Sequence, residues 1–352
     1  MTKDQGYNKV ALKILRKHIK IQNYQGAYPL TMTLTKSNLI DTIYQNTDLN
    51  KTEAIQTTIT IRCAEFYNLH MTCHAHGWKN LAPFKWSDES KSLSFAAFIG
   101  EEPVDIEVIQ NGSSLKATLH SHRKLDQKLL DEARQTITRS LDLNTETDRL
   151  LEVAEKFGED YVKLIENGAG RMLHAPTLWE DAAKTLFTTN CSWSLTKKMC
   201  ESACSERFSE PAPSGCYPFP SAEKLSDYSA KNIGRLMPVG YRADYLIDLA
   251  KRFSEDPFLG NIESNGYDYK SAYQHVINSR GFGDYACNHL LVLAGYFDRI
   301  PVDTVVVSYL KKNYRVRKPE SFIKRKYGKW GKYMFWGLKL EKMLKRQNWL
   351  GD

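Results

Sequence analysis

The hydrophobic pattern of this sequence changes only once along the chain, and this change restricts the fold more than any other feature. Across residues 57–119, apolar residues alternate with polar ones or form β-branched runs, with turn signals at Gly100 and at Asn111-Gly112. This pattern predicts a small antiparallel sheet. An amphipathic helix is expected across 125–141, and the remainder has helical spacing interrupted by Pro and Gly. Strands followed by helices predict an α+β chain, with a small antiparallel sheet domain before a mainly α-helical domain.

Together with the weakly patterned start of the chain, this change divides the 352 residues into three predicted segments. Residues 1–55 form an N-terminal extension whose role the sequence does not reveal, because its polar stretches are only weakly patterned. Residues 56–140 form the sheet domain with its helix, and residues 141–352 form the helical domain. A chain of this length exceeds one ordinary core, and a hydrophobic content of 42% is high enough for a buried interior.

The positive charge of the chain is concentrated near its C-terminal end. Residues 311–346 contain fourteen Lys/Arg and two Glu, a net charge of +12, so that the total of +8 leaves −4 for the rest of the chain. Aromatic residues are interleaved with these basic ones, which is typical of a packed segment that also presents charge. The segment predicts an anion-binding face, for which nucleic acid is the expected polyanion. The alternative is a helix face that is merely solvated.

Composition also bears on the compartment. The sequence has no apolar run of about eighteen residues and no signal-peptide pattern at its start. We therefore expect a cytoplasmic, nucleoid-associated or nuclear protein that is neither secreted nor bound to a membrane. Its seven cysteines are expected to be reduced thiols, as is usual for intracellular proteins.

The cysteine and histidine spacings do not predict a metal site. Cys200, Cys204 and Cys216 lack the doubled C-x-x-C spacing of a structural zinc site, so we expect buried thiols there. Two pairs of alternating histidines have no third ligand near them in the sequence: His74 with His76, and His120 with His122.

One window, residues 273–314, carries the strongest functional signal. It has the pattern of a helix, a tight hairpin at Gly281-Phe282-Gly283, a second helix, a short loop and a third helix. Backbone N–H groups in such a hairpin can point outward together and bind phosphate oxygens, directly or through a cation. In the loop, Ile300-Pro301-Val302-Asp303 places a carboxylate at the start of the third helix, where N–H groups favour its ionised form. The plainer alternatives are that the glycines only form a turn and that Asp303 only caps its helix.

With two motifs that precede it, this window resembles the helix-hairpin-helix/Gly-Pro-Asp superfamily of base-excision DNA glycosylases, of the 3-methyladenine and 8-oxoguanine kind. The resemblance covers roughly residues 141–340 and follows the order of the family. Its motifs are GRMLHAP at 170–176 with a helix ending in TTNCSW at 188–193, GYRADYL at 240–246, the hairpin, and Asp303. Two weaker similarities flank them: HGWKNLAPFKW at 76–86 resembles the sheet region of the superfamily, and WGKY at 330–333 the last helix of its oxoguanine branch.

The resemblance implies a reaction and the residues that perform it. Asp303 would be the catalytic carboxylate in the hydrolysis of the N-glycosidic bond of a damaged base flipped out of duplex DNA, with no metal or redox cofactor. Trp193, Tyr285 and His289 would line the base pocket. The resemblance also implies three kinds of DNA contact. Asn190 and Tyr241 would fill the gap left by the flipped base, and Arg242 would contact the opposite base. DNA phosphates would be bound by the hairpin, where Na⁺ or K⁺ could bridge, and by the basic segment: Gly281, Phe282, Gly283, Lys324, Arg325 and Lys329.

Each of these residues also has a plainer interpretation. Asn190 could be a helix C-cap, Tyr241 could pack in the core, and Arg242 could be surface charge. Tyr285 and His289, one helical turn apart, could both be core residues.

Departures from the family's pattern bear on the chemistry and the substrate. Bifunctional members carry a lysine two residues after the second hairpin glycine, where this chain has Tyr285, so the resemblance implies a monofunctional enzyme that leaves an abasic site. Leu338 and Leu195 stand where the oxoguanine branch has a glutamine and a second arginine. We therefore expect an alkylated purine, since a cationic base leaves readily and stacks well on aromatic rings.

Several alternatives stay open at this point. One is an 8-oxoguanine-type glycosylase, and another is a glycosylase/lyase that uses a displaced lysine. A third is a catalytically inert protein of the same fold that binds damaged DNA, and a fourth is a basic RNA-binding module. The expected partner is double-stranded DNA that contains a damaged base, bound by a monomer.

Overall fold

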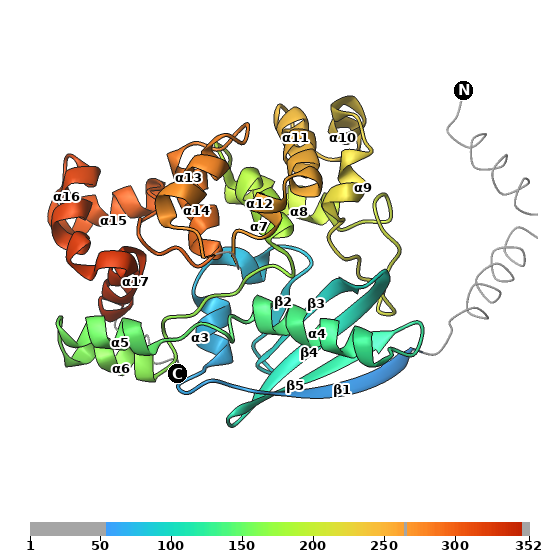
Figure 1. Ribbon diagram of the computed structural model, residues 1–352, viewed down its shortest axis with the longest axis horizontal. Coiled ribbons are helices and arrows are strands. Elements are labelled where there is room, and N and C mark those ends of the chain that lie inside the picture. Colours follow the sequence, from blue (N-terminus) through green and yellow to red (C-terminus); the bar gives the residue numbers. More distant parts are fainter. Residues whose placement is uncertain (1–53, 264–265, 347–352) are drawn as a thin grey trace, which may run out of the picture. The chain divides into compact units, whose positions relative to one another are not determined.

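The computed structural model describes residues 54–263 and 266–346, and the N-terminal part of this region is a five-stranded antiparallel sheet (Figure 1). The order across the sheet is β1-β5-β4-β3-β2. This confirms the predicted antiparallel sheet, to which the structure adds the short edge strand β2. The bounds are β1 Ile55–Arg62, β2 Lys85–Ser87, β3 Ser92–Ile99, β4 Glu102–Asn111 and β5 Ser114–Ser121.

Local turn chemistry connects the longer strands. β4 and β5 are joined by a two-residue turn, because Asn111 pairs with Ser114 across the hairpin. Gly112 in this turn has φ of +57°, a left-handed conformation that two-residue hairpins require and that glycine adopts without strain. The two strands pair in register from Asp105 with His120 to Asn111 with Ser114, so that alternate side chains face the core.

Helix α4 (Gln127–Ser140) covers one face of the sheet, as the amphipathic pattern predicts (Figure 1). It begins at Asp126, whose side chain accepts a hydrogen bond from the backbone N–H of Leu129 at 2.9 Å. Ala133 and Ile137, four residues apart, are fully buried, and the helix packs against β3 and β1.

The remainder of the described chain is helical, apart from loops. Two short elements lie between β1 and β2, namely α3 (Leu69–His74) and the 3-10 turn η1 (Gly77–Asn80). α7 occupies a central position, since it packs against α8, α11 and α14. The helices after α4 are α5 Asp148–Glu155, α6 Glu159–Glu166, α7 Leu178–Thr188, α8 Trp193–Ala203, α9 Ala222–Ser226, α10 Ala230–Leu236, α11 Arg242–Glu255, α12 Pro257–Gly260, α13 Tyr269–Ile277, α14 Asp284–Leu293, α15 Thr304–Tyr314, α16 Pro319–Tyr327, η2 Gly328–Tyr333 and α17 Met334–Leu344.

The sheet and the helices share one hydrophobic core. A single cluster of buried side chains extends from Ile59 in β1 to Leu340 in α17. The predicted boundary at residue 140 therefore separates strands from helices but does not separate two cores. Residues 1–53, nearly all of the predicted extension, lie outside the described residues. Within the described ranges, no helix is both long and apolar enough to cross a lipid bilayer.

A second, smaller core holds the last three helices together. Its buried side chains, among them Val306, Leu310 and Leu338, come from α15, α16 and α17 and from the loop before α15. Beside it, the carboxylate of Glu341 on α17 accepts hydrogen bonds from the hydroxyl groups of Tyr309 and Tyr327 at 2.7 and 2.9 Å. Four donors in all surround this buried carboxylate, so its hydrogen bonding ties α17 to α15 and α16: Tyr309, Tyr314, Tyr327 and Lys326.

One lysine and one glutamate are buried together inside α7. Lys184 Nζ lies 2.6 Å from Glu180 Oε1, one helical turn away, and neither residue is more than 5% exposed. Burial lowers the pKa of Lys184, but the charge of Glu180 opposes it and leaves that pKa raised. Burial also raises the pKa of Glu180, and the charge of Lys184 opposes that rise.

Candidate active site

Asp303 is the N-cap of α15, immediately after the loop that follows α14. Its Oδ1 atom accepts a hydrogen bond from the backbone N–H of Val306 at 2.6 Å. Among residues 54–263 and 266–346, no group donates a hydrogen bond to the second oxygen, Oδ2. The side chain is half-buried. Asp303 thus does cap its helix, as the plainer interpretation holds, yet the cap occupies only one carboxylate oxygen and leaves the other for a ligand.

The helix-hairpin-helix is formed by α13, the turn at 278–283 and α14. Gly281 has φ of +85°, and a Cβ atom there would lie 2.7 Å from the ring of Tyr245 and 2.8 Å from the side chain of Leu186, so glycine is required twice over. Gly283 is the N-cap of α14, where no side chain caps the helix, so N–H groups of the first turn are not capped. The carboxylate of Asp284 stands in the same turn, bonded to the hydroxyl group of Tyr273 at 3.0 Å.

Phe282 differs from the other hairpin residues. Its side chain is 5% exposed and belongs to the main core. The prediction that Phe282 contacts DNA is therefore restricted to its backbone, because the ring is committed to packing.

Three aromatic walls come together around α14. The rings of Tyr285 and His289 lie 5.6 Å apart between centroids, and Trp78 meets the other side of His289 edge-on at 5.1 Å. Burial lowers the pKa of His289 to about 4, so this histidine is neutral at pH 7. The charge of Asp303 acts in the opposite direction, which places Asp303 and His289 in the same electrostatic environment.

Trp193 and Trp78 extend this wall from other elements. Trp193, at the start of α8, is 41% exposed, and its ring lies against Gly77, where a Cβ atom would be 2.7 Å from it. Trp78 follows Gly77 in η1 and donates a hydrogen bond from its indole N–H to Asp181 at 2.6 Å. The structure thus brings Trp193 next to the turn that carries Trp78, a residue that the sequence analysis did not single out.

The predicted gap-filling residues lie on two adjacent loops. Asn190, just after α7, is exposed and has φ of +47°. Tyr241, just before α11, is 54% exposed, and Arg242 places its guanidinium 4.5 Å from the centre of the Tyr241 ring. The two loops are joined because the guanidinium of Arg242 donates a hydrogen bond to the backbone oxygen of Thr189. Asn190 and Tyr241 are therefore both exposed on loops that Arg242 joins, and their role as gap-filling residues stays a prediction.

The position of Arg242 disagrees with the prediction that it contacts the opposite base. This residue is only 3% exposed, and its guanidinium is held by Thr189 and the Tyr241 ring. In this arrangement the arginine fixes the Asn190 loop against the start of α11. Sequence position alone did not distinguish an exposed arginine from a buried one.

The basic residues predicted to contact phosphates are on the surface. Lys324 and Arg325 on α16 and Lys329 in η2 are all exposed. Their neighbour Lys326 is different, since its ammonium is 2.8 Å from Glu341 inside the C-terminal core. The basic segment therefore combines packed and solvated charges, as its interleaved aromatic residues predict.

Two lysines of α17 that the sequence analysis did not select interact electrostatically with Asp303. Lys339 donates a hydrogen bond from Nζ to the backbone oxygen of Ala75. Burial lowers the pKa of Lys339 to about 8, with Lys342 and Arg346 adding to the effect and Asp303 opposing it. The pKa of Lys342 is lowered in the same way and is also opposed by Asp303. The i, i+3 and i+7 spacing of residues 339, 342 and 346 is the signal that could have found this cationic face.

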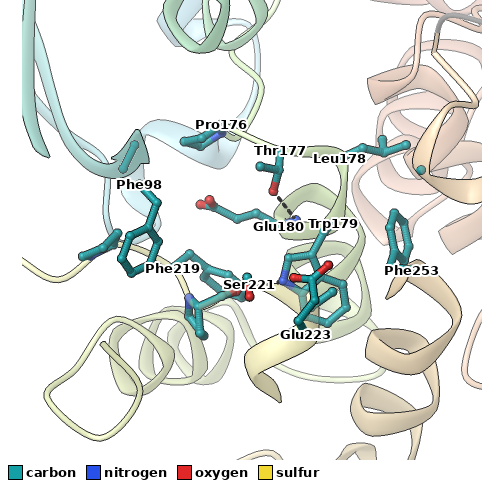
Figure 2. A pocket seen from close by; sticks show the side chains of 15 residues that line it. Phe98, Pro176, Thr177, Leu178, Trp179, Glu180, Phe219, Ser221, Glu223 and Phe253 are labelled. Carbon is teal, nitrogen blue, oxygen red and sulfur yellow. Dashed lines mark hydrogen bonds between the residues drawn. The ribbon is translucent and has the colours of Figure 1, made fainter. Parts of the chain in front are cut away.

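The pocket drawn in Figure 2 lies elsewhere. It is lined by residues such as Phe98 at the end of β3, Trp179 near the start of α7 and Phe253 of α11. In Figure 2 the hydroxyl oxygen of Thr177 accepts a hydrogen bond from the backbone N–H of Glu180, which is the N-cap bond of α7. None of the predicted site residues lines this pocket, so we do not assign the reaction to it.

One histidine group differs from the two pairs considered in the sequence, because it joins His74 to His70 and not to His76. Ligand atoms of His70, His74 and Asp88 all lie within 4.8 Å of one another, and the two imidazole rings stack at 3.9 Å. This is the arrangement in the described chain that could hold a metal ion. However, Nζ of Lys79 lies 2.5 Å from Nε2 of His74 and already partners that nitrogen.

The cysteines are all free thiols. Cys200 is fully buried, as expected, whereas Cys216 is exposed and so departs from the prediction of a buried thiol. Cys216 stands in the loop after α8, where its backbone N–H bonds the hydroxyl group of Ser214 at 3.3 Å.

Comparison with known proteins gives three similarities. The chain is 24% identical over 178 residues to an N-glycosylase/DNA lyase of Saccharomyces cerevisiae, a match that covers 47% of this chain and 46% of that protein. The apo form of the Clostridium acetobutylicum 8-oxoguanine glycosylase/lyase superposes with a TM-score of 0.62 at 15% identity, covering 82% of this chain and 96% of that one. The 3-methyladenine DNA glycosylase of Archaeoglobus fulgidus also gives 0.62, at 16% identity, covering 82% and 99%.

The reach of these similarities differs between sequence and structure. The sequence match spans about half the length of the yeast protein, and no protein-family model matches the chain. The structural matches extend over nearly the whole of the neighbouring proteins. The Clostridium enzyme is also known in complex with double-stranded DNA that contains cytosine opposite 8-oxoguanine, and that structure superposes with a TM-score of 0.59, at 16% identity, covering 83% of this chain and 98% of that one.

Proposed function

We propose that this chain, which has the fold of the helix-hairpin-helix/Gly-Pro-Asp DNA glycosylases, releases a damaged purine from duplex DNA by hydrolysis of its N-glycosidic bond. One observation carries the proposal: a carboxylate with one fixed oxygen and one open oxygen, Asp303, shares its electrostatic environment with the aromatic walls of α14. The Tyr285 and His289 side chains supply the apolar faces against which a flipped base can stack.

Asp303 suits the chemistry of this reaction. As the base departs, positive charge develops on the sugar, and a fixed carboxylate nearby stabilises that charge more in the transition state than in the ground state. The N-terminal end of α15 favours the ionised carboxylate. Oδ2 can face the sugar or orient the attacking water, while Oδ1 remains bonded to Val306.

The protruding loops supply the rest of the base-flipping machinery. Extrusion of a base leaves a gap in the duplex that must be filled. Asn190 and Tyr241 are exposed on neighbouring loops, and the buried Arg242 holds those loops together. We therefore assign gap filling to Asn190 and Tyr241, and a positioning role to Arg242.

Phosphate contacts fall to the hairpin and to the basic segment. The uncapped first turn of α14 can take a phosphate oxygen directly or through a monovalent cation. Lys324 and Lys329 are exposed cations, and Arg325 is exposed with its guanidinium 5.5 Å from the centre of the Phe322 ring, so all three are available to neutralise phosphates. The expected partner is double-stranded DNA with a damaged base, bound in a strongly salt-dependent way.

Two substrate classes compete for this site. The aromatic walls favour an alkylated purine, because a cationic base stacks well on them. The cationic face of α17 favours a neutral oxidised purine, because Lys339 and Lys342 raise the cost of bringing a positive base near Asp303. The chain is similar both to an 8-oxoguanine glycosylase/lyase and to a 3-methyladenine glycosylase, so these similarities do not favour one substrate class over the other.

The test uses duplexes that contain either an N-methylated purine or 8-oxoguanine opposite cytosine. We expect release of one base, with Asp303→Asn lowering the rate by about 100- to 1,000-fold. Asp268→Asn is the matched control, since Asp268 caps α13 through a 2.9 Å bond from the Ser271 N–H but lies outside the proposed site.

Asparagine caps helices as well as aspartate does, so both variants should fold. Equal rates for the two variants would contradict the assignment of Asp303. Tight duplex binding without release of either base would instead favour a catalytically inert binder of damaged DNA.

A further inference from the structure

Two histidines and one aspartate form a cluster that is not part of the candidate active site. His70 and His74 stand one helical turn apart on α3, so both imidazoles lie on one face of that helix. Asp88 comes from the turn between β2 and β3. Ligand atoms of the three residues lie within 4.8 Å of one another. The fold thus brings groups that can bind a metal ion to one point from two separate elements.

Trp86 in β2 holds this cluster together. Its ring meets the imidazoles of His70 and His74 edge-on, with 5.6 and 5.1 Å between ring centroids. Its indole N–H donates a hydrogen bond to Oδ1 of Asp88 at 2.9 Å. A hydrogen-bonded carboxylate has fewer orientations open to it, and metal-binding carboxylates are usually held in this way. One tryptophan therefore orients the aspartate and packs against both histidines.

The hydrogen bonds of His74 determine which of its nitrogens can bind a ligand. Nδ1 lies 2.9 Å from the backbone oxygen of His70, and because a carbonyl oxygen can only accept, Nδ1 carries the proton. The ammonium of Lys79 lies 2.5 Å from Nε2 and can only donate, so Nε2 has the free lone pair. A neutral imidazole with one nitrogen anchored on the backbone and the other open is the form that binds metal ions.

Lys79 already places a positive charge beside these ligand atoms. It extends from η1 on a flexible side chain and is only partly buried, so its ammonium can move into solvent. A second cation, Lys91, lies 4.0 Å from Oδ1 of Asp88 and is also exposed. A divalent ion that displaces Lys79 from His74 gains two nitrogens and the negative charge of Asp88 in exchange for one hydrogen bond.

The distances allow such an ion after a small adjustment. Ligands at about 2.1 Å from a tetrahedral zinc ion lie about 3.4 Å from one another, so the three side chains must close by about 1 Å. The Asp88 side chain is exposed and His70 is partly exposed, so rotation of side chains supplies this closure without moving the backbone.

We propose that His70, His74 and Asp88 form a binding site for a divalent transition-metal cation such as zinc, and that Lys79 is the competing cation when the metal is absent. Two imidazole nitrogens and one carboxylate oxygen suit zinc better than magnesium or calcium, which prefer oxygen ligands. Water completes the four ligands of the ion. The bound ion joins α3 to the turn between β2 and β3, and the inference does not depend on the proposed function.

The experiment titrates zinc chloride into the full-length protein, purified without a histidine tag, and follows binding by isothermal titration calorimetry. We expect one zinc ion per chain to bind at this site. His74→Ala should weaken its binding by about 100-fold and Asp88→Asn by about tenfold, because a ligand should contribute at least as much as the groups that orient it. Magnesium chloride should give no binding that these substitutions change.

His122→Ala is the matched control for the loss of one histidine. The Nε2 atom of His122 lies 3.0 Å from the backbone oxygen of Pro211, and His122 belongs to no group of three metal-binding side chains among the residues that the structure describes. This variant should bind zinc as wild type does.

Lys79→Met gives a result that misfolding cannot imitate. Without the ammonium, nothing competes for Nε2 of His74, so zinc should bind roughly tenfold more tightly than in wild type. Zinc should also raise the midpoint of thermal unfolding of wild type and of Lys79→Met, but not that of His74→Ala.

The inference is overturned if wild-type protein binds no zinc, if either ligand variant binds zinc as tightly as wild type, or if Lys79→Met leaves the affinity unchanged. Base release from damaged duplexes is a separate measurement. Its failure would leave the zinc result standing, and failure to bind zinc would leave base release standing.

Discussion

Two places in this molecule bring a lysine near a carboxylate, and the pKa of the lysine shifts in opposite directions at the two places. In α7, Lys184 and Glu180 are 2.6 Å apart in the core, and the pKa of Lys184 is raised. In the candidate active site, Asp303 caps α15 while Lys339 bonds a backbone carbonyl, and the pKa of Lys339 falls to about 8. A direct ion pair makes the lysine and the carboxylate inert, whereas a lysine and a carboxylate that interact electrostatically without forming a pair keep their reactive forms.

The largest expected effect separates activity from stability at Asp303. Asp303→Asn should lower base release by about 100- to 1,000-fold while changing the free energy of unfolding by less than about 1 kcal/mol, because asparagine keeps the cap. Rates of base release and denaturant unfolding measure the two quantities. A stability loss comparable with the activity loss would mean that Asp303 is only a structural cap.

At the buried pair of Lys184 and Glu180, we expect a substitution to lower stability and not activity. Lys184→Met removes one partner and leaves the Glu180 carboxylate uncompensated in the core, which should cost about 3 to 5 kcal/mol of stability. Denaturant unfolding measures this cost. Adding Glu180→Leu should recover most of it, because two apolar side chains need no charge compensation. If Lys184→Met were as stable as wild type, Lys184 and Glu180 would not form an inert ion pair that the core depends on.

The pH dependence of the free energy of unfolding should distinguish Lys339 from Lys184. Lys339 has a folded pKa of about 8, below its unfolded value, so the folded state releases this proton first as the pH rises. The unfolding free energy of wild type, relative to Lys339→Met, should therefore increase between about pH 8 and pH 10 and be independent of this group below pH 8. Thermal or denaturant unfolding of the two proteins across this range measures the difference, and a flat difference would contradict the depressed pKa.

The smallest effect concerns three exposed cations that form no ion pair with the residues the structure describes. Replacing Lys324, Arg325 and Lys329 by glutamine should leave the fold intact, since all three are exposed. The slope of log affinity for duplex DNA against log salt should become shallower by up to about three. Fluorescence anisotropy at several salt concentrations measures the slope, with Lys128→Gln on α4 as the comparison. An unchanged slope would place the phosphate contacts elsewhere.

Much of the fold could be predicted because its signals are local. Alternation over 57–119 indicated the antiparallel sheet, and its hairpins connect strands that are neighbours in sequence. The hairpin glycines and Asp303 fall within one short window, so their spacing alone placed a carboxylate at the start of α15. Two-residue turns, helix caps and residue spacing depend on nearby residues, which a single sequence displays.

The site was predictable only where its residues share such a window. Arg242 was expected on the surface and is buried, because its environment is decided by Thr189 of another loop. Trp78 meets the ring of His289 from the connection between β1 and β2, far from His289 in sequence. The spacing of His74 gave no third ligand, yet the fold supplies Asp88 from a different element.

By itself, the sequence determined the α+β order of elements, the hairpin, the cap at Asp303 and the absence of a lysine at position 285. Only the tertiary structure decided which side chains surround that carboxylate. Lys339 belongs to the last helix, and nothing in its local pattern distinguishes it from the other lysines of a basic segment. Its depressed pKa comes from burial against Ala75 and from charges on other elements, and both depend on how distant segments pack.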